Sequence, residues 1–274
     1  MPEDESEDES GNGLWSDMEQ SDPRATRLEL DYLKPELLLQ EHGIEHTIVV
    51  FGSTRIVEPS AAHQKHALAL KLAQERPDDP ALQRSLRTAE RIQENSKYYE
   101  AARDLGRLVS ESGHGPDDSR VVITTGGGPG IMEAANRGAF DAGAESVGLN
   151  IQLPREQEPN PYITPNLSFS FHYFALRKLH FLHRARALVA FPGGYGTFDE
   201  LFETLTLVQT GKIEPLPIIL VGQAFWSRAV NFEFLVDEGV ITPRDKELFS
   251  YAETGPEIWD SIVDWHKVSG QPLY

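Results

Sequence analysis

Short, continuous apolar runs recur along the chain, and each is rich in β-branched residues and bounded by turn residues. A segment that is apolar at successive positions is buried on both faces, which is typical of strands in a parallel sheet. The runs therefore predict strands that are covered by other elements on both sides. They lie at residues 46–52, 120–125, 146–151, 186–191 and 216–221.

Helical patterns of apolar residues fall between these runs. Alternation of strands and helices predicts an α/β fold, with a doubly wound, mainly parallel, Rossmann-like sheet and helices on both faces. In such a sheet, ligands bind beyond the carboxyl ends of the strands. The predicted helices cover residues 97–112, 129–142, 172–185, 198–210 and 224–238.

Residues 60–96 interrupt this alternation. They predict two helices, at residues 61–75 and 81–95, which are separated by Pro77 and Pro80 because proline cannot continue a helix. We interpret them as a helical hairpin that is inserted between the first strand and its crossover helix.

The chain predicts one folded domain and an acidic tail. With 274 residues and 39% hydrophobic content it can bury a sizeable core. We place the domain at residues 24–274, beginning with a helix over 24–42 whose leucines form part of an apolar stripe. Residues 1–22 contain nine Asp or Glu and no Lys or Arg, half of the net charge of −18. Such a segment cannot offset its chain entropy by burial, so residues 1–23 predict a disordered tail, with an interaction tail as the alternative.

Composition also narrows the partners. Nucleic-acid binding draws its affinity from clustered Lys and Arg, so the net charge of −18 argues against a nucleic-acid partner. The absence of cysteine excludes disulfides, thiolate nucleophiles and thiolate metal sites. No basic region followed by an apolar leader and no apolar run of membrane-spanning length occurs, so we expect no membrane partner and a cytoplasmic protein.

The first glycine-rich turn, Gly126-Gly127-Gly128-Pro129-Gly130, follows a predicted strand and begins a helix. Unpaired N–H groups at the positive end of a helix dipole attract an anion such as a phosphate. The G-x-G-x-G spacing differs from the dinucleotide motif G-x-G-x-x-G, and the next strand ends without an acid for a ribose, so no nicotinamide cofactor is expected. No P-loop motif occurs either. The alternative is a tight turn that binds nothing.

The second turn, Pro192-Gly193-Gly194-Tyr195-Gly196-Thr197, has the same setting and is followed by Asp199 and Glu200. Two such turns in one sheet predict one nucleotide site, with a carboxylate beside a phosphate. Two interpretations of Glu200 remain open. It is either a catalytic carboxylate or one half of a capping box, Thr197-x-x-Glu200, in which it only bonds the start of the helix.

The predicted helix over residues 172–185 carries Arg177 and Lys178 and precedes the strand that enters the second turn. The planar fork of Arg177 suits a phosphate or carboxylate, and Lys178 offers a point charge, although charges on a helix surface need no function. His180 and His183 lie on the same helix, but no acid or cysteine completes a metal-ligand set in sequence, so no metal is expected.

Three segments together resemble the LOG family, whose members are often labelled possible lysine decarboxylases. They are G-G-G-P-G-I-M-E-A at 126–134, the aromatic-rich helix with Arg177-Lys178, and P-G-G-Y-G-T-F-D-E at 192–200. The resemblance runs from about Thr47 to the C-terminus and omits the hairpin. Many cytokinin-activating members read G-L-M-G where this chain has Gly130-Ile131-Met132-Glu133. Decarboxylation would need a pyridoxal phosphate lysine in a recognisable setting, which Lys178 alone does not provide.

The resemblance implies an activity and a set of site residues. Family members studied as enzymes are phosphoribohydrolases, which cleave the N-glycosidic bond of a nucleoside 5′-monophosphate and release the free base and ribose 5-phosphate. By motif, Arg177 and Glu200 match the catalytic pair. The residues that match the phosphate-binding turns are Gly127, Gly128, Gly193, Gly194, Gly196 and Thr197. Candidate substrate contacts are Lys178, Glu133 and Ser53. The resemblance further implies a homodimer or larger assembly with sites near the subunit interface.

We therefore expect a nucleoside 5′-monophosphate phosphoribohydrolase that acts on a cytokinin ribotide or a purine nucleotide, without a metal or an organic cofactor. Bond cleavage builds positive charge on the ribose, so Glu200 would stabilise that charge while Arg177 holds the ligand. The alternative is a non-catalytic nucleotide-binding regulatory protein. Both would bind a phosphate, and only the first would turn over a substrate.

Overall fold

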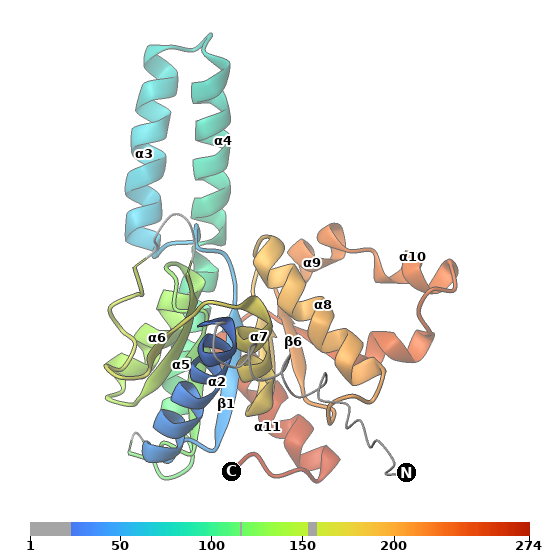
Figure 1. The fold of residues 1–274 in the computed structure, drawn as a ribbon. Helices are drawn as coiled ribbons and strands as arrows, with labels where there is room; N and C mark the ends of the chain where they lie inside the picture. Colours follow the sequence, from blue (N-terminus) through green and yellow to red (C-terminus); the bar gives the residue numbers. More distant parts are fainter. Residues whose placement is uncertain (1–22, 116, 153–157) are drawn as a thin grey trace, which may run out of the picture.

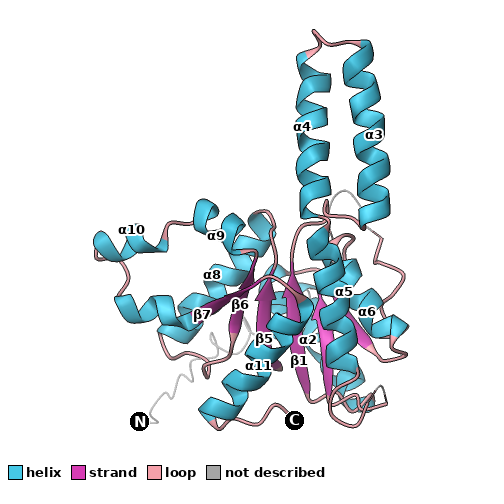
Figure 2. Ribbon diagram, turned by 180° about the vertical axis from the view of Figure 1, so that it is seen from behind, coloured by secondary structure: helices cyan, strands magenta, loops and turns pink. Residues whose placement is uncertain are grey.

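The computed structural model describes residues 23–115, 117–152 and 158–274. In this part of the chain a parallel sheet of seven strands lies between two layers of helices (Figures 1 and 2). The expected α/β fold, doubly wound and Rossmann-like, is confirmed. The strands are β1 (His46–Phe51), β2 (Val121–Thr125), β3 (Ser146–Ile151), β4 (Ser168–Phe171), β5 (Ala185–Ala190), β6 (Ile218–Val221) and β7 (Phe249–Ala252).

Helices connect the parallel strands and cover both faces of the sheet. They are α2 (Pro23–Glu41), α3 (Pro59–Glu75), α4 (Pro80–Asn95), α5 (Lys97–Ser110), α6 (Ile131–Asp141), α7 (Phe174–His183), α8 (Tyr195–Gln209), α9 (Gln223–Ala229), α10 (Phe232–Asp237) and α11 (Gly255–Ser269), with a short 3-10 helix at Pro243–Leu248. None of the described helices has the length and apolar composition to cross a membrane.

The strand order β4-β3-β2-β1-β5-β6-β7 reverses direction at the centre of the sheet. After β1 the chain builds outward to β4, and it then returns to pair β5 with the other side of β1. The loops that leave β1 and β5 therefore diverge to opposite faces. This divergence opens a crevice at their carboxyl ends, where ligands bind in open α/β sheets.

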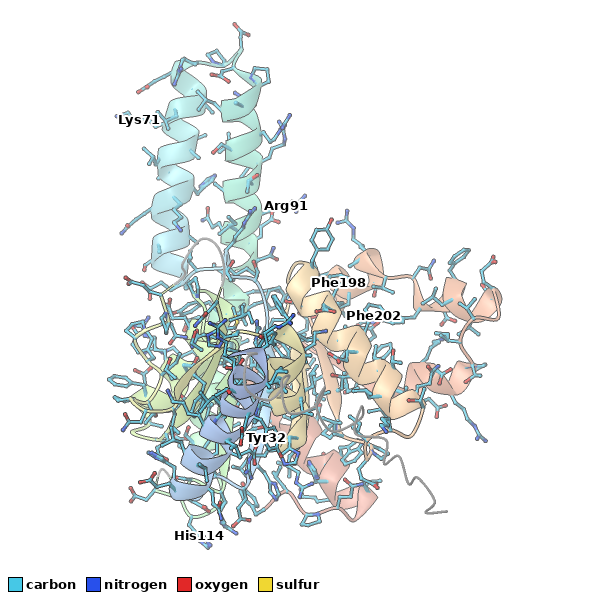
Figure 3. The ribbon with its side chains drawn as sticks, in the orientation of Figure 1. Tyr32, Lys71, Arg91, His114, Phe198 and Phe202 are labelled. Atoms are coloured by element: carbon cyan, nitrogen blue, oxygen red, sulfur yellow. The ribbon has the colours of Figure 1, made fainter. Side chains whose placement is uncertain are left out.

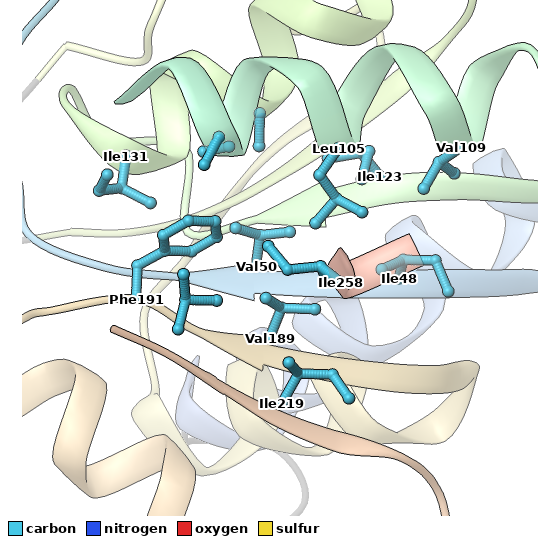
Figure 4. Close-up of a cluster of buried hydrophobic side chains, with 14 of the residues drawn as sticks. Ile48, Val50, Leu105, Val109, Ile123, Ile131, Val189, Phe191, Ile219 and Ile258 are labelled. Carbon is cyan, nitrogen blue, oxygen red and sulfur yellow. The ribbon is translucent and has the colours of Figure 1, made fainter. Parts of the chain in front are cut away.

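The core lies on both faces of the sheet, as the continuous apolar runs predict. Ile48 and Val50 of β1 face one layer, which also contains Leu105 of α5 and Ile258 of α11 (Figure 4). Val49 and its neighbours on alternate positions face the other layer, formed mainly by α2, α7, α8 and α9. All five predicted strands are confirmed with bounds that shift by at most two residues.

Helices α3 and α4 lie where the sequence predicts the two helices of the inserted hairpin. Asp79 caps α4, because its Oδ1 accepts hydrogen bonds from the N–H groups of Ala81 (2.9 Å) and Leu82 (3.3 Å). Helices α3 and α4 lie side by side and project away from the carboxyl edge of the sheet (Figures 1 and 2). The helix expected at 24–42 is present as α2, which begins at Pro23. The acidic tail at residues 1–22 lies outside the described residues.

Three features differ from the expectations. The two edge strands, β4 and β7, and helix α11 were not predicted, and each edge strand has only four residues. The prediction of one continuous helix over residues 224–238 was wrong. Val230 has an extended conformation (φ −136°, ψ 127°), and Asn231 then caps α10 by accepting a hydrogen bond from Phe234 N–H, so the segment forms two short helices.

Candidate active site

A pocket of about 560 Å³ lies at the carboxyl ends of β1 and β5, where the strand order reverses. Its walls come from the loop at residues 52–56, the second glycine-rich turn, Arg177 of α7 and the foot of α4. The pocket thus lies where a doubly wound sheet is expected to hold a ligand. Among the described residues, no group of three or more His, Asp or Glu side chains is arranged to hold a metal ion.

The second glycine-rich turn forms one wall of this pocket. Gly194 is the N-cap of α8, and Gly193, Gly194, Gly196 and Thr197 all line the pocket. A Cβ atom at Gly193 would overlap the side chain of Thr197, which requires glycine at this position. Because the first N–H groups of a helix have no intrahelical partners, the start of α8 presents donors and a positive dipole end to the pocket.

Glu200 lies in the second turn of α8, and its side chain is buried, with only 5% of the residue exposed. It is not itself a lining residue of the pocket, but it follows the lining residue Thr197 by three positions on the same helix. The capping box that remained open on sequence grounds is not formed. The cap of α8 is Gly194, Thr197 is already inside the helix, and no side chain caps the helix start. The role of Glu200 is therefore not that of a capping residue.

Burial changes the acidity of this carboxyl group. Desolvation raises the pKa of Glu200 to about 7, although the positive charges of Arg177 and Lys178 act in the opposite direction. A carboxyl group with a pKa near neutrality can both accept and release a proton at physiological pH.

Arg177 reaches the pocket from α7 and is largely removed from water. Its guanidinium lies over the rings of Phe174 (5.7 Å to the centroid) and Phe181 (5.1 Å), and its Nε atom has no hydrogen-bond partner among the described groups. Burial lowers its pKa, while the charges of Glu200 and Asp199 act to raise it. A partly desolvated guanidinium with an unused donor is well suited to bind an anionic ligand.

Helix α2 fixes the start of the helix that carries Arg177. The Oδ2 atom of Asp31 accepts hydrogen bonds from the N–H groups of His172 (2.8 Å) and Tyr173 (3.3 Å), directly before α7. Asp31 is buried. The N-terminal helix is therefore part of the support of the site, although it is far from Arg177 in the sequence.

Lys178, a candidate substrate contact, faces a different surface. Its Nζ atom forms ion pairs with Asp199 (2.8 Å) and Glu203 (2.9 Å), and it lines a separate groove between α7 and α8. Its charge is thus already compensated by two carboxylates of α8. This ion-pair arrangement links α7 to α8 and holds Arg177 and Glu200 in register.

The first glycine-rich turn is enclosed by a buried polar network. Gly127 N–H donates to the hydroxyl of Thr125 (3.0 Å), and the amide of Asn160 donates to the carbonyls of Gly127 and Gly128 (both 3.2 Å). The same amide donates to Asn136 (3.0 Å), which also accepts from Thr125 (2.7 Å). Gly127 and Gly128 are buried and do not line the pocket.

Ser53 and Glu133 have different environments. Ser53 lies in the pocket and joins the two turns: its N–H donates to the carbonyl of Pro192 (3.0 Å), and its carbonyl accepts from Ile131 N–H (3.1 Å). Glu133 is turned away from the pocket and accepts a hydrogen bond from the hydroxyl of Tyr99 (2.9 Å). The structure therefore brings Ser53, but not Glu133, to the same pocket as Arg177.

Sequence reasoning missed several pocket residues. Arg55 and Met132 line the pocket, as do Thr88, Arg91, Ile92 and Asn95 of α4 and Phe225 of α9. The spacing of the four residues on α4 is a helical face, but no local signal shows that this face meets the site. The contact depends on how the inserted hairpin stands on the sheet.

Comparisons with known proteins agree with the motifs. A family model described as "Possible lysine decarboxylase" matches residues 132–262. The cytokinin riboside 5′-monophosphate phosphoribohydrolase LOG3 of Arabidopsis thaliana is 30% identical over 176 residues, which cover 62% of this chain and 76% of that protein. The cytokinin riboside 5′-monophosphate phosphoribohydrolase LOG of Oryza sativa subsp. japonica is 29% identical over 168 residues, which cover 60% of this chain and 65% of that protein. The chain belongs to the LOG family.

A likeness to a solved structure is weaker. The X-ray structure of TM1055 is 20% identical and covers 80% of this chain and 99% of its own, with a TM-score of 0.48. The assignment of the fold class therefore rests on the strand order and pairing described above.

Proposed function

We propose that this protein is a nucleoside 5′-monophosphate phosphoribohydrolase, which hydrolyses the N-glycosidic bond of a cytokinin ribotide or a purine nucleotide. The observation that carries the proposal is the buried carboxyl group of Glu200, which follows the pocket-lining turn on α8 and interacts electrostatically with Arg177. The names of the plant relatives support the same reaction class.

The charge of the pocket supports a phosphorylated ligand. Arg55, Arg91 and Arg177 line it, and no Asp or Glu is among the described lining residues, although the whole chain has a net charge of −18. We place the 5′-phosphate at the start of α8, where the amides near Gly194 and Gly196 and the hydroxyl of Thr197 can donate to it. The role of Gly127 and Gly128 as phosphate ligands stays a prediction. It has less support than that of the second turn, because Gly127 N–H is already bonded to Thr125.

The reaction requires stabilisation of a cation. As the bond between the anomeric carbon and the base nitrogen breaks, positive charge develops on the ribose, and the bonding electrons leave with the base. The carboxylate of Glu200 stabilises that charge and accepts a proton from the attacking water, whose oxygen bonds to the anomeric carbon. Arg177 binds the ligand and holds the ribose beside Glu200, or assists the departing base. The departing nitrogen takes up a proton from solvent, and Glu200 then releases the proton that it accepted, so that one water is consumed. The products are ribose 5-phosphate and the free base.

The test is a substrate screen with product analysis. The protein is incubated with AMP, GMP, CMP, UMP and N6-isopentenyl AMP, and free base and ribose 5-phosphate are quantified by chromatography. We expect both products in equal amounts from at least one nucleotide, and far slower cleavage of the corresponding nucleoside, because the phosphate contributes binding energy. Equal rates on adenosine and AMP would contradict the proposed phosphate site.

The same screen separates the enzyme from a nucleotide-binding regulator. Calorimetric titration of each nucleotide measures binding independently of turnover. If the protein binds nucleotides tightly but releases no free base even at high protein concentration, it is a nucleotide-binding regulator. The proposed enzymatic function is then wrong.

A further inference from the structure

We propose that the helical hairpin is part of the substrate site and that Asn95, at the foot of α4, is a specificity-determining residue that hydrogen-bonds the base of the nucleotide. The inference rests on the proposed function, since it takes a nucleoside 5′-monophosphate as the ligand. The hairpin lies outside residues 132–262, the segment that matches the family model.

One face of α4 is turned toward the pocket. Thr88, Arg91, Ile92 and Asn95 all line it, and their spacing of i, i+3, i+4 and i+7 places them along one stripe of the helix. Arg91 lies on the lower half of the hairpin, and Lys71 lies far above it (Figure 3). The hairpin therefore contributes its foot to the pocket, while its upper part projects into solvent.

The foot of α4 is fixed to the domain. Ser96 directly after α4 is buried, and its hydroxyl donates to the carbonyl of Gln93 (2.7 Å). Helix α5 then begins at Lys97, and its Tyr98 and Tyr99 are buried in the core. Asn95 therefore stands at a fixed position on the wall, as a residue that discriminates between ligands must.

Asn95 carries unused hydrogen-bonding capacity. Its side chain is half-buried in the pocket wall and has no hydrogen-bond partner among the described residues. The two glutamines of α4 are bonded, because Gln83 donates to the carbonyl of Pro77 (3.2 Å) and Gln93 is paired with His63 (3.5 Å). A primary amide offers both donors and an acceptor, which matches the mixed edge of a nucleobase.

The remaining walls fit a base in this position. With the phosphate at the start of α8 and the ribose beside Arg177, the base is directed to the part of the pocket that the glycine-rich turn does not form. The pocket walls outside that turn include Ile92 of α4 and Phe225 of α9 as well as Asn95. Apolar and aromatic side chains against the faces of a base, with a polar group at its edge, are a common mode of recognition.

The experiment compares base preference in the wild type and two variants. We measure kcat/KM for AMP, GMP, CMP and UMP with the wild type, Asn95→Leu and Asn95→Asp. Asn95→Leu keeps the branching at Cγ and removes the hydrogen bonds, so the preference for the best base over the others should fall by about tenfold or more. Asn95→Asp can only accept when ionised, so it should change which base is preferred.

A matched control lies on the same helix. Arg87 is exposed on α4 and does not line the pocket, so Arg87→Ala should leave the ranking of the four bases unchanged. Inhibition constants of the free bases give a second readout, and they should follow the same ranking as kcat/KM in every protein. Thermal unfolding of each variant verifies that the fold is kept.

The outcomes are distinguishable. If Asn95→Leu folds and slows all four nucleotides equally, or none, Asn95 does not contact the base and this inference is overturned. If the wild type cleaves neither these four nor N6-isopentenyl AMP, the proposed function fails by itself. The ranking of nucleotide dissociation constants in the wild type and Asn95→Leu then decides the role of Asn95, and an unchanged ranking overturns it.

Discussion

The turn at residues 126–130 and the turn at residues 192–197 both follow a buried strand at the centre of the sheet, and both begin a helix. Their surroundings differ. The first turn is enclosed, since Thr125 and Asn160 occupy its N–H and carbonyl groups and Gly130 (φ +76°) packs against the carbonyl of Ser53. The second turn is open to the pocket, with Gly194 and Gly196 exposed and Tyr195 97% exposed.

The comparison separates two uses of glycine. In the first turn glycine permits a positive φ and a close approach of backbone to backbone. In the second, a Cβ atom at Gly194 or Gly196 would meet no described atom within 4 Å, so these residues are not required by packing. A glycine-rich turn is therefore not a phosphate site by its sequence alone. It becomes one when its amides remain unbonded and face a cavity.

The largest effect is expected at Glu200, which follows the open turn. Glu200→Gln should lower kcat by about a hundredfold or more, because it removes a negative charge placed against the developing cation. The melting temperature should be unchanged or higher, because no capping interaction is lost and a buried charge is removed. Activity assays and thermal unfolding of the same preparation measure both quantities.

The matched control is the neighbouring carboxylate. Asp199→Asn breaks only an ion pair with Lys178 on a partly exposed surface, so its effect on kcat should be much smaller. If Glu200→Gln keeps most of its activity, Glu200 is a structural residue and is not the catalytic carboxylate of the proposed reaction.

The next effect concerns pH. Glu200 has a pKa of about 7, and the proposed reaction needs its carboxylate form, which is populated above that value. Below it, kcat should fall by up to about tenfold per pH unit, and above it kcat should level off. Measurements at saturating substrate avoid the titration of the free substrate phosphate. A rate that rises toward acid pH would instead make Glu200 the proton donor.

The pH dependence of the unfolding free energy, compared between the wild type and Glu200→Gln, tests whether the pKa of Glu200 is raised. The raised pKa means that the folded state binds the Glu200 proton more tightly than the unfolded chain does. This contribution to the unfolding free energy is present at acid pH and is lost as the pH rises from the unfolded value through about 7. Wild type should therefore lose stability relative to Glu200→Gln over that interval, as measured by denaturant titrations at several pH values.

Substitution of one glycine in each turn tests the comparison directly. Gly194→Ala has an accessible backbone conformation (φ −99°), so it should fold normally and raise the KM for the nucleotide by about tenfold, because the methyl group stands beside the pocket. Gly130→Ala would overlap Ser53 at a positive φ, so it should lower the unfolding free energy by about 1–3 kcal/mol. The opposite pattern would show that the two turns have exchanged roles.

The smallest effect on activity is expected from the network under the first turn. Thr125→Val leaves Gly127 N–H without a partner and removes one of the two hydrogen bonds that Asn136 Oδ1 accepts, so it should cost about 1–3 kcal/mol of stability. If the first turn is only a support, KM should change by less than about threefold, a much smaller effect than the loss of a direct contact to a ligand. A large rise in KM with unchanged stability would make Gly127 a phosphate ligand after all. Denaturant titration and steady-state kinetics separate the two cases.

The fold was predictable where burial is visible in local sequence. The strands from β1 to β6, apart from β4, are continuous apolar runs because both of their faces are covered. The edge strands β4 and β7 have only four residues each. The residues of β4 alternate between exposed and buried, and β7 has a single buried residue, so neither pattern is long enough to be recognised. The break between α9 and α10 depends on the single extended residue Val230, which no periodicity reveals.

The sequence by itself determined the alternation of strands and helices, the two glycine-rich turns, and the order of Arg177 and Glu200 along the chain, because each depends on residues close together in sequence. Only the tertiary structure decided which turn faces a cavity, that Glu200 is buried and not a cap, and that the foot of the hairpin joins the site. The physical reason is that accessibility, desolvation and unused hydrogen bonds are set by distant partners. Asn160, which closes the first turn, is 33 residues from Gly127, and the strand reversal beside β1 brings the remaining walls together.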